Sequence, residues 1–126
     1  MRPKPSAQVA IWVAQQPGTE LFTTSITEAE IFYGIEFLGR KRREGLLAAA
    51  EAMFSEDFAG RVFVFDSDAA RVFAKIGAAR RALGRPISHA DTQIAALAQV
   101  RGAKLATRNV DDFEGCGIEV VDPWNR

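Results

Sequence analysis

The sequence predicts an α/β fold with a largely parallel sheet, and three observations support this prediction. Short runs rich in β-branched and aromatic residues alternate with longer stretches whose apolar residues recur at helical spacing. Glycine or proline separates most of these segments. The chain has 126 residues, of which 48% are hydrophobic and 25% charged, so it can bury a core. We therefore expect a single domain over residues 1–126, in which helices connect parallel strands.

The first half of the chain predicts three helices and one strand. Apolar residues at helical spacing predict a short helix over 7–15. Leu21–Ser25 then has the composition of a strand. The next helix begins at Thr27 or two residues earlier, and Gly39 ends it. A further helical stretch covers about 41–58, with an apolar stripe along one side.

The second half predicts two helices, each preceded by a capping residue. Asp66 and Ser67 cap a helix that runs to about Leu83, and Ser88 caps another that ends before Gly102. Apolar runs of strand length precede or follow these helices. The whole chain therefore predicts one sheet with helices on both faces. The four expected strands are Leu21–Ser25, Val62–Phe65, Lys104–Thr107 and Ile118–Val121.

Composition excludes several classes of protein. Sixteen basic residues balance sixteen acidic ones, which argues against a protein that coats nucleic acid without specificity. Cys116 is the single cysteine, so no disulfide framework forms, and with His89 as the single histidine a typical zinc site is not expected. No phosphate-binding glycine loop, apolar membrane span or signal-type N-terminus is present, so we expect a cytoplasmic protein that does not enter membranes.

A basic stretch interrupts the otherwise balanced charge. Residues 69–90 hold five basic residues and no acid. Such a stretch is either a solvated helix face or a surface that contacts phosphates. The five residues are Arg71, Lys75, Arg80, Arg81 and Arg85.

Two acids stand at unusual positions in the predicted helices. Asp91 and Glu30 each have apolar or small residues at +3, +4 and +7, so each shares a helix face with them. A carboxylate on such a face needs a partner, because an unpaired buried charge is costly. Helix capping is one explanation, since Thr27 and Ser88 each precede one of these acids by three residues. The other explanation is a ligand site at the carboxyl ends of the strands.

A third polar cluster follows the strand that ends at Thr107. It contains Asn109, Asp111 and Asp112, and it is either a turn or part of the same site. Acids that converge on one edge of a sheet form a site of oxygen ligands, which suits Mg²⁺ or Mn²⁺. A metal held in this way can activate water against a phosphodiester.

Three segments together resemble the ordered motifs of PIN-domain ribonucleases, in particular VapC-type toxins of toxin–antitoxin pairs. The resemblance covers nearly the whole chain. It implies a metal-dependent endoribonuclease with a three-layer α/β/α fold. The segments are Ser25–Gly34, Pro86–Ala96 and Leu105–Phe113.

The resemblance also implies roles for individual residues. Glu30, Asp91 and Asp112 correspond to metal-binding acids, and Asp112 is preferred to its neighbour because the family acid directly precedes the Phe. Thr107 and Asn109 would support the site. A family member of this kind binds Mg²⁺ or Mn²⁺, forms a homodimer and is blocked by an antitoxin protein.

The basic stretch gains a role from this resemblance. Arg80, Arg81 and Arg85 are expected to lie beside the acidic site and to contact the RNA backbone.

One family feature is missing from the sequence. The family begins with a central strand that ends in a metal-binding Asp, whereas this chain begins with Met1–Pro5, which resembles the segment after that strand. Either the start lies upstream or the chain is naturally shorter; we expect the former, since a sheet without its middle strand leaves unpaired backbone groups. The alternative function is an inactive PIN-like module that only binds antitoxin or RNA.

Overall fold

The computed structural model describes residues 22–107 and 109–122. The helix predicted over 7–15 lies outside the described residues. The described part of the chain forms two compact units, residues 22–64 and residues from 65 onwards, and each unit is treated by itself. No helix in the described ranges is both long enough and apolar enough to cross a membrane.

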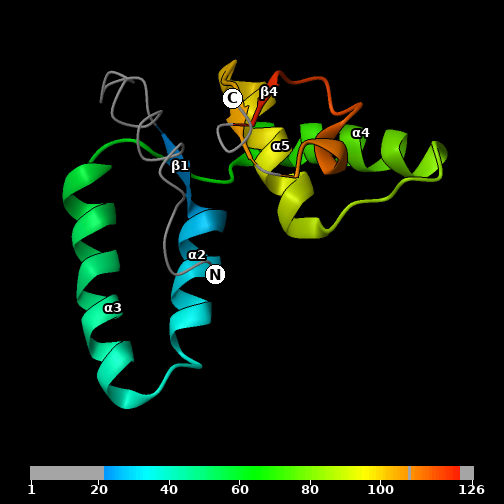
Figure 1. The fold of residues 1–126 in the computed structure, drawn as a ribbon. Coiled ribbons are helices and arrows are strands. Elements are labelled where there is room, and N and C mark those ends of the chain that lie inside the picture. The colour runs from blue at the N-terminus through cyan, green and yellow to red at the C-terminus, as the bar shows by residue number, and fades with distance from the viewer. Residues whose placement is uncertain (1–21, 108, 123–126) are drawn as a thin grey trace. The chain divides into compact units, whose positions relative to one another are not determined.

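The first unit consists of two short strands and three helical segments (Figure 1). Strand β1 is Thr23–Thr24 and pairs in parallel with β2, Val62–Phe63. Helices α2 (Ser25–Ile35) and α3 (Arg40–Ala52) lie between them, and α3 continues into a π-helical turn, η2 (Met53–Asp57). The helices predicted before Gly39 and over 41–58 are therefore confirmed.

The capping of α2 differs from the prediction. Thr24 is the N-cap: its hydroxyl oxygen accepts a hydrogen bond from the backbone N–H of Thr27 at 2.9 Å. Thr27 therefore lies inside the first turn and caps nothing. The capping explanation for Glu30 is wrong, because this acid lies six residues after the true N-cap, beyond the free N–H groups of the first turn.

Among its described residues, the second unit has two long helices, a 3₁₀ turn and two strands. Helix α4 is Ser67–Ala82 and α5 is His89–Arg101. Strands β3 (Leu105–Ala106) and β4 (Val120–Val121) pair in parallel, and the 3₁₀ turn η3 (Val110–Phe113) lies between them in sequence.

Both long helices begin and end as the sequence predicts. Asp66 and Ser88 accept hydrogen bonds from the first turns of α4 and α5. Gly84 and Gly102, which follow these helices, have φ angles of 72° and 63°, a conformation that glycine adopts at little cost.

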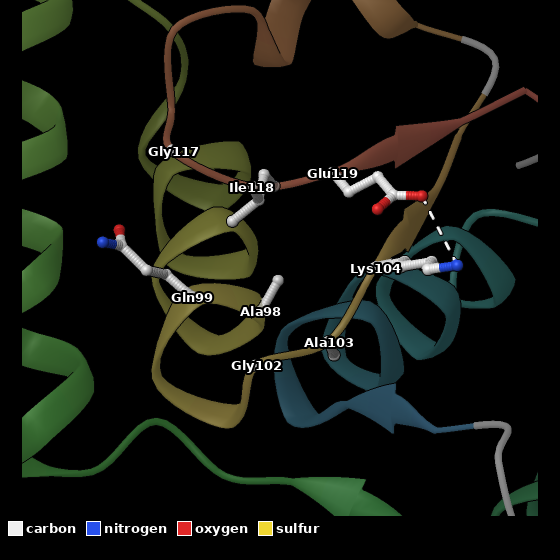
Figure 2. Close-up of a pocket in the computed structure, with 8 residues that line it drawn as sticks. All are labelled: Ala98, Gln99, Gly102, Ala103, Lys104, Gly117, Ile118 and Glu119. Carbon is white, nitrogen blue, oxygen red and sulfur yellow. Dashed lines mark ion pairs between the residues drawn. The ribbon is translucent and has the colours of Figure 1, made fainter.

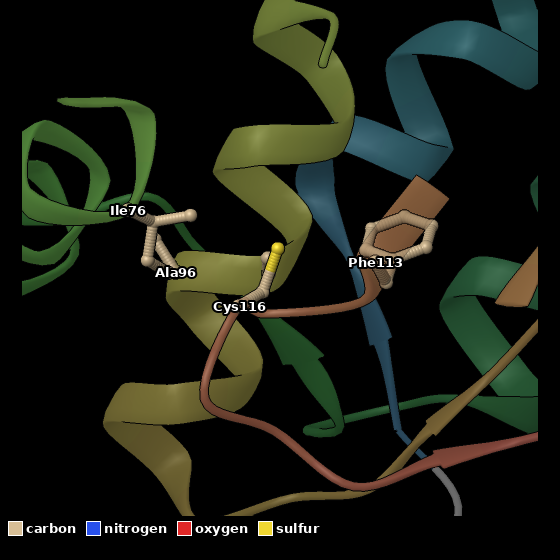
Figure 3. Close-up of a cluster of buried hydrophobic side chains, with 5 residues drawn as sticks. Ile76, Ala96, Phe113 and Cys116 are labelled. Atoms are coloured by element: carbon tan, nitrogen blue, oxygen red, sulfur yellow. The ribbon is translucent and has the colours of Figure 1, made fainter. Parts of the chain in front are cut away.

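The core of the second unit forms where α4, α5 and the segment after η3 meet. Its buried residues are Ile76, Ala95, Ala96, Phe113 and Cys116, each at most 6% exposed (Figure 3). Small residues on α5 permit close packing with α4. Phe113 and Cys116 anchor the chain between η3 and β4 to this core.

The strands differ from the predicted single sheet. Each is two residues long, and they form two two-stranded parallel sheets, one in each unit. An α/β fold with parallel strands is thus confirmed, while the four-stranded sheet is not seen in the described residues. The three-layer arrangement and the missing first strand stay predictions, as does the single domain.

Candidate metal-binding site

Asp91 lies in the first turn of α5, where the cap holds it. Its backbone N–H donates to the hydroxyl of Ser88 at 3.1 Å. Its side chain is half-buried, and the next turns of the same face carry the buried residues Ala95 and Ala98. The prediction that Asp91 shares an inward-facing stripe is therefore confirmed. Capping and a site role are compatible here, because the cap uses the backbone of Asp91 and leaves its carboxylate available.

Asp112 lies in η3, just beyond the carboxyl end of β3. The Thr107 hydroxyl, directly after β3, accepts a hydrogen bond from the backbone N–H of Asn109 at 3.1 Å. The carbonyl oxygen of Asn109 in turn accepts from the N–H of Asp112 at 3.1 Å. The hydroxyl of Thr107 and the backbone of Asn109 thus contribute to the turn that carries Asp112, and their support of a metal site stays a prediction.

The carboxylates of Asp91 and Asp112 interact electrostatically. Burial raises the pKa of Asp91 above its ordinary value, a hydrogen bond from the Ser88 side chain lowers it, and the negative charge of Asp112 raises it further. Two acids from separate elements, α5 and η3, are therefore close enough for the charge of one to act on the other. A divalent cation would offset this repulsion, so the oxygen ligands present here fit Mg²⁺ or Mn²⁺.

Glu30 has a different setting in the first unit. It is exposed on α2, as is Tyr33 at 69%, and Phe37, two residues after the helix ends, is 72% exposed. Glu30 shares a face with an apolar residue as expected, but its carboxylate is not buried there, and the residue that α2 buries is Ile35. Within residues 22–107 and 109–122, no group of three or more His, Cys, Asp or Glu side chains is placed to hold a metal ion.

The three arginines expected to contact RNA have separate environments. Arg80, in the last turn of α4, is 3% exposed and donates to the backbone carbonyl oxygen of Glu114. Arg85 forms an ion pair with the carboxylate of Glu114, with 3.4 Å between Nη1 and Oε2. Arg81 is exposed.

Glu114 was not singled out by the sequence. It lies 34 residues after Arg80 and 29 after Arg85, and no local pattern links residues so far apart.

A surface hollow of about 270 Å³ lies at the opposite end of the β3–β4 pair. The residues that line it come from the end of α5 and from the positions before β3 and before β4 (Figure 2). Lys104 and Glu119 form an ion pair there, at 3.4 Å. Because Thr107 and Asp112 follow the carboxyl end of β3, this hollow is separate from the candidate site.

The comparison with protein families assigns the chain to a family. A model of the PIN domain matches residues 1–115, so the chain belongs to the PIN domain family.

Two curated proteins and one solved structure are similar over nearly the full chain. The VapC ribonuclease Y4jK of Sinorhizobium fredii is 34% identical over 96% of this chain and 87% of its own. The toxin FitB of Neisseria gonorrhoeae is 30% identical over 99% of this chain and 91% of its own. The crystal structure of FitAcB from the same organism has a TM-score of 0.92, with 30% identity, 99% of this chain and 91% of that chain covered.

Proposed function

We propose that the chain is a divalent-metal-dependent endoribonuclease and the toxin component of a toxin–antitoxin pair. The observation that supports this best is the placement of two acids: Asp91 in the capped first turn of α5 and Asp112 in the turn that follows β3. The charge of Asp112 acts on the carboxylate of Asp91. Membership of the PIN domain family also supports a nuclease toxin, because a VapC ribonuclease and a toxin are among the similar proteins. In this proposal residues 1–126 act as one domain.

Each site residue has a role in the proposed reaction. Glu30, Asp91 and Asp112 would hold Mg²⁺ or Mn²⁺, and their negative charges make the site selective for a hard cation. Thr107 and Asn109 keep the Asp112 turn in place. A metal bound here would activate water for attack on the phosphorus of an RNA phosphodiester.

Partners are part of the same proposal. The RNA backbone would contact exposed basic residues. Of the three candidates, Arg81 and Arg85 are exposed, and Arg85 already pairs with Glu114. An antitoxin protein would block the site, and the chain would form a homodimer in the cytoplasm. The solved structures of similar proteins support the proposal of an antitoxin partner, since they include FitAB and VapBC-1.

The proposal is tested by changing Asp112 to Asn beside a matched control, Asp111→Asn. Both residues are exposed in the same turn. We expect Asp112→Asn to lower Mg²⁺-dependent cleavage of a labelled RNA by more than about 100-fold, beyond the loss typical of residues that only orient ligands. Asp111→Asn should cleave at nearly the original rate, and both variants should melt like the parent.

Three results would count against the proposal. Equal losses in both variants would show that the turn tolerates no change, and full activity of Asp112→Asn would remove this acid from the site. A parent protein that binds antitoxin or RNA without cleaving RNA would support the inactive PIN-like module instead.

A further inference from the structure

The segment that carries Asp112 has little stability of its own. The turn η3 is four residues long, and no side chain caps it. Short 3₁₀ turns have poorer hydrogen-bond geometry than α-helices, so they depend on contacts with the rest of the protein. Phe113 and Cys116 supply such contacts on the core side. The backbone next to Asp112 needs further contacts of its own.

Two arginines from the end of α4 reach this segment on either side of Asp112. Arg80 donates to the carbonyl oxygen of Glu114. Arg85 donates to the carbonyl oxygen of Asp111 at 3.3 Å and also faces the Glu114 carboxylate at 3.4 Å. The carbonyls that they bind therefore bracket Asp112 and its neighbour Phe113.

The backbone at the end of α4 fixes the two arginines relative to each other. The N–H of Arg85 donates to the carbonyl of Arg80 at 2.9 Å, and the N–H of Gly84 donates to that of Arg81 at 3.0 Å. This pair of bonds, with a positive φ at Gly84, is a Schellman motif. Both guanidinium groups therefore project from one rigid helix end.

Arg80 is buried inside the protein and does not lie on its surface. It is 3% exposed, and within the described part of the chain its Nε atom is buried without a hydrogen-bond partner. Its positive charge also acts on the buried thiol of Cys116, whose pKa it lowers against the larger effect of burial. A buried guanidinium on a backbone carbonyl is suited to holding that carbonyl in place, and it is unsuited to contact with RNA.

We propose that Arg80 and Arg85 are positioning residues that clamp the η3 segment and so fix the place of Asp112 in the folded protein. This inference rests on the proposed function, in which Asp112 is a metal ligand. The proposed clamp gives the arginines of the basic stretch two different roles. Arg80 and Arg85 hold the segment that carries Asp112, whereas Arg81 contacts the RNA backbone.

The clamp and a purely electrostatic role make opposite predictions for Arg85. Removing a positive charge near a cation site strengthens metal binding if charge alone matters. Removing a clamp weakens it, because the metal must then order the segment itself. We expect Arg85→Gln to raise the Kd for Mn²⁺, measured by calorimetry without RNA, by about tenfold, as for residues that orient metal ligands. Arg85→Lys keeps the charge but loses the planar fork, so it should recover only part of the affinity.

Arg81→Gln is the matched control, since it removes an exposed charge four residues earlier, in the last turn of α4. It should leave the Kd for Mn²⁺ unchanged and reduce the salt dependence of RNA binding measured in a chelator. Arg85→Gln should leave that salt dependence unchanged. It should also speed hydrogen exchange of the backbone amides from Asp112 to Cys116 with no metal present.

The outcomes separate the clamp from the proposed function. Tighter or unchanged Mn²⁺ binding in Arg85→Gln, together with weaker binding in Asp112→Asn, would overturn the clamp alone. Unchanged binding in both variants would overturn the metal site as well. Unchanged hydrogen exchange in Arg85→Gln would overturn the clamp whatever the metal does.

Discussion

Asp91 and Glu30 are both helical acids that come after a capping hydroxyl, yet the structure treats them differently. Asp91 lies three residues after Ser88, is half-buried, and interacts with the charge of Asp112. Glu30 lies six residues after Thr24, beyond the first turn of α2. Asp91 is held by the Ser88 cap and by partial burial without a metal ion. Glu30 is an exposed side chain on α2.

This difference suggests two ways of contributing to one site. A preorganised pair of like charges keeps a site ready for a cation, and natural proteins accept a cost in stability for such arrangements. An exposed acid adds a ligand without that cost. The second unit should therefore determine whether Asp91 and Asp112 are preorganised for a metal ion.

The largest difference should appear when one phenylalanine from each unit is changed to alanine. Phe113 is 4% exposed and packs in the core beside Asp112, so Phe113→Ala should reduce the free energy of unfolding by about 3–5 kcal/mol. Phe37 is 72% exposed, so Phe37→Ala should change it by less than about 1 kcal/mol. Urea denaturation of both variants measures the two values.

The same experiment can overturn the comparison. If Phe37→Ala destabilises the protein as much as Phe113→Ala, the α2 face is buried against another chain in solution. Repeating the measurement at several protein concentrations would then show a destabilisation that depends on concentration.

The sequence predicted well those features that depend on local chemistry. Ser88 and Asp66 begin helices because their side chains accept N–H groups of the first turn, and Gly102 ends one because it adopts a positive φ. These interactions span only a few residues, so spacing reveals them. At Thr24 the chain offered several hydroxyls in a row, and spacing alone did not identify the capping one.

Features that depend on distant contacts were harder to predict. The sequence correctly placed Asp91 on an inward face, yet the same argument failed for Glu30, because periodicity does not say which side of a helix finds a partner. The arginines show the same limit. The sequence left Arg80 as either a solvated helix residue or a contact for the RNA backbone, and its burial and its bond to Glu114, 34 residues away, were not predicted.

The two capping hydroxyls offer a comparison of intermediate size. Ser88→Ala and Thr24→Ala should each cost about 1 kcal/mol, because each leaves an N–H of the first turn without its partner. Only Ser88→Ala should also weaken Mn²⁺ binding, since the Ser88 side chain lowers the pKa of Asp91. That loss should grow as the pH is lowered, because protons compete with the metal for the carboxylate.

Calorimetric titration with Mn²⁺ at several pH values, beside thermal melting, measures both effects. Equal metal affinities for the two variants at every pH would show that the hydrogen bond from Ser88 does not reach the metal-binding function of Asp91.

The smallest expected effect is a dependence of stability on pH that Asp91 alone introduces. Because its pKa is raised in the folded protein, the native state holds this proton to a higher pH than the unfolded chain does. Between about pH 4, where an ordinary Asp ionises, and the raised pKa, the native state therefore binds more protons, and the free energy of unfolding falls as the pH rises. Asp91→Asn lacks this titration, so the metal-free parent should lose stability relative to it across that window and then stay at a constant difference. Other acids titrate in the same range, and subtracting the stability curve of Asp91→Asn from that of the parent removes their contribution.

Asp112→Asn should reduce the difference between the parent and Asp91→Asn, since it removes one of the causes of the raised pKa of Asp91. Replacing an exposed acid of α2 should leave that difference unchanged. A parent that gains stability relative to Asp91→Asn with rising pH would mean that Asp91 is stabilised as a carboxylate, and the repulsion between the two acids would then be refuted.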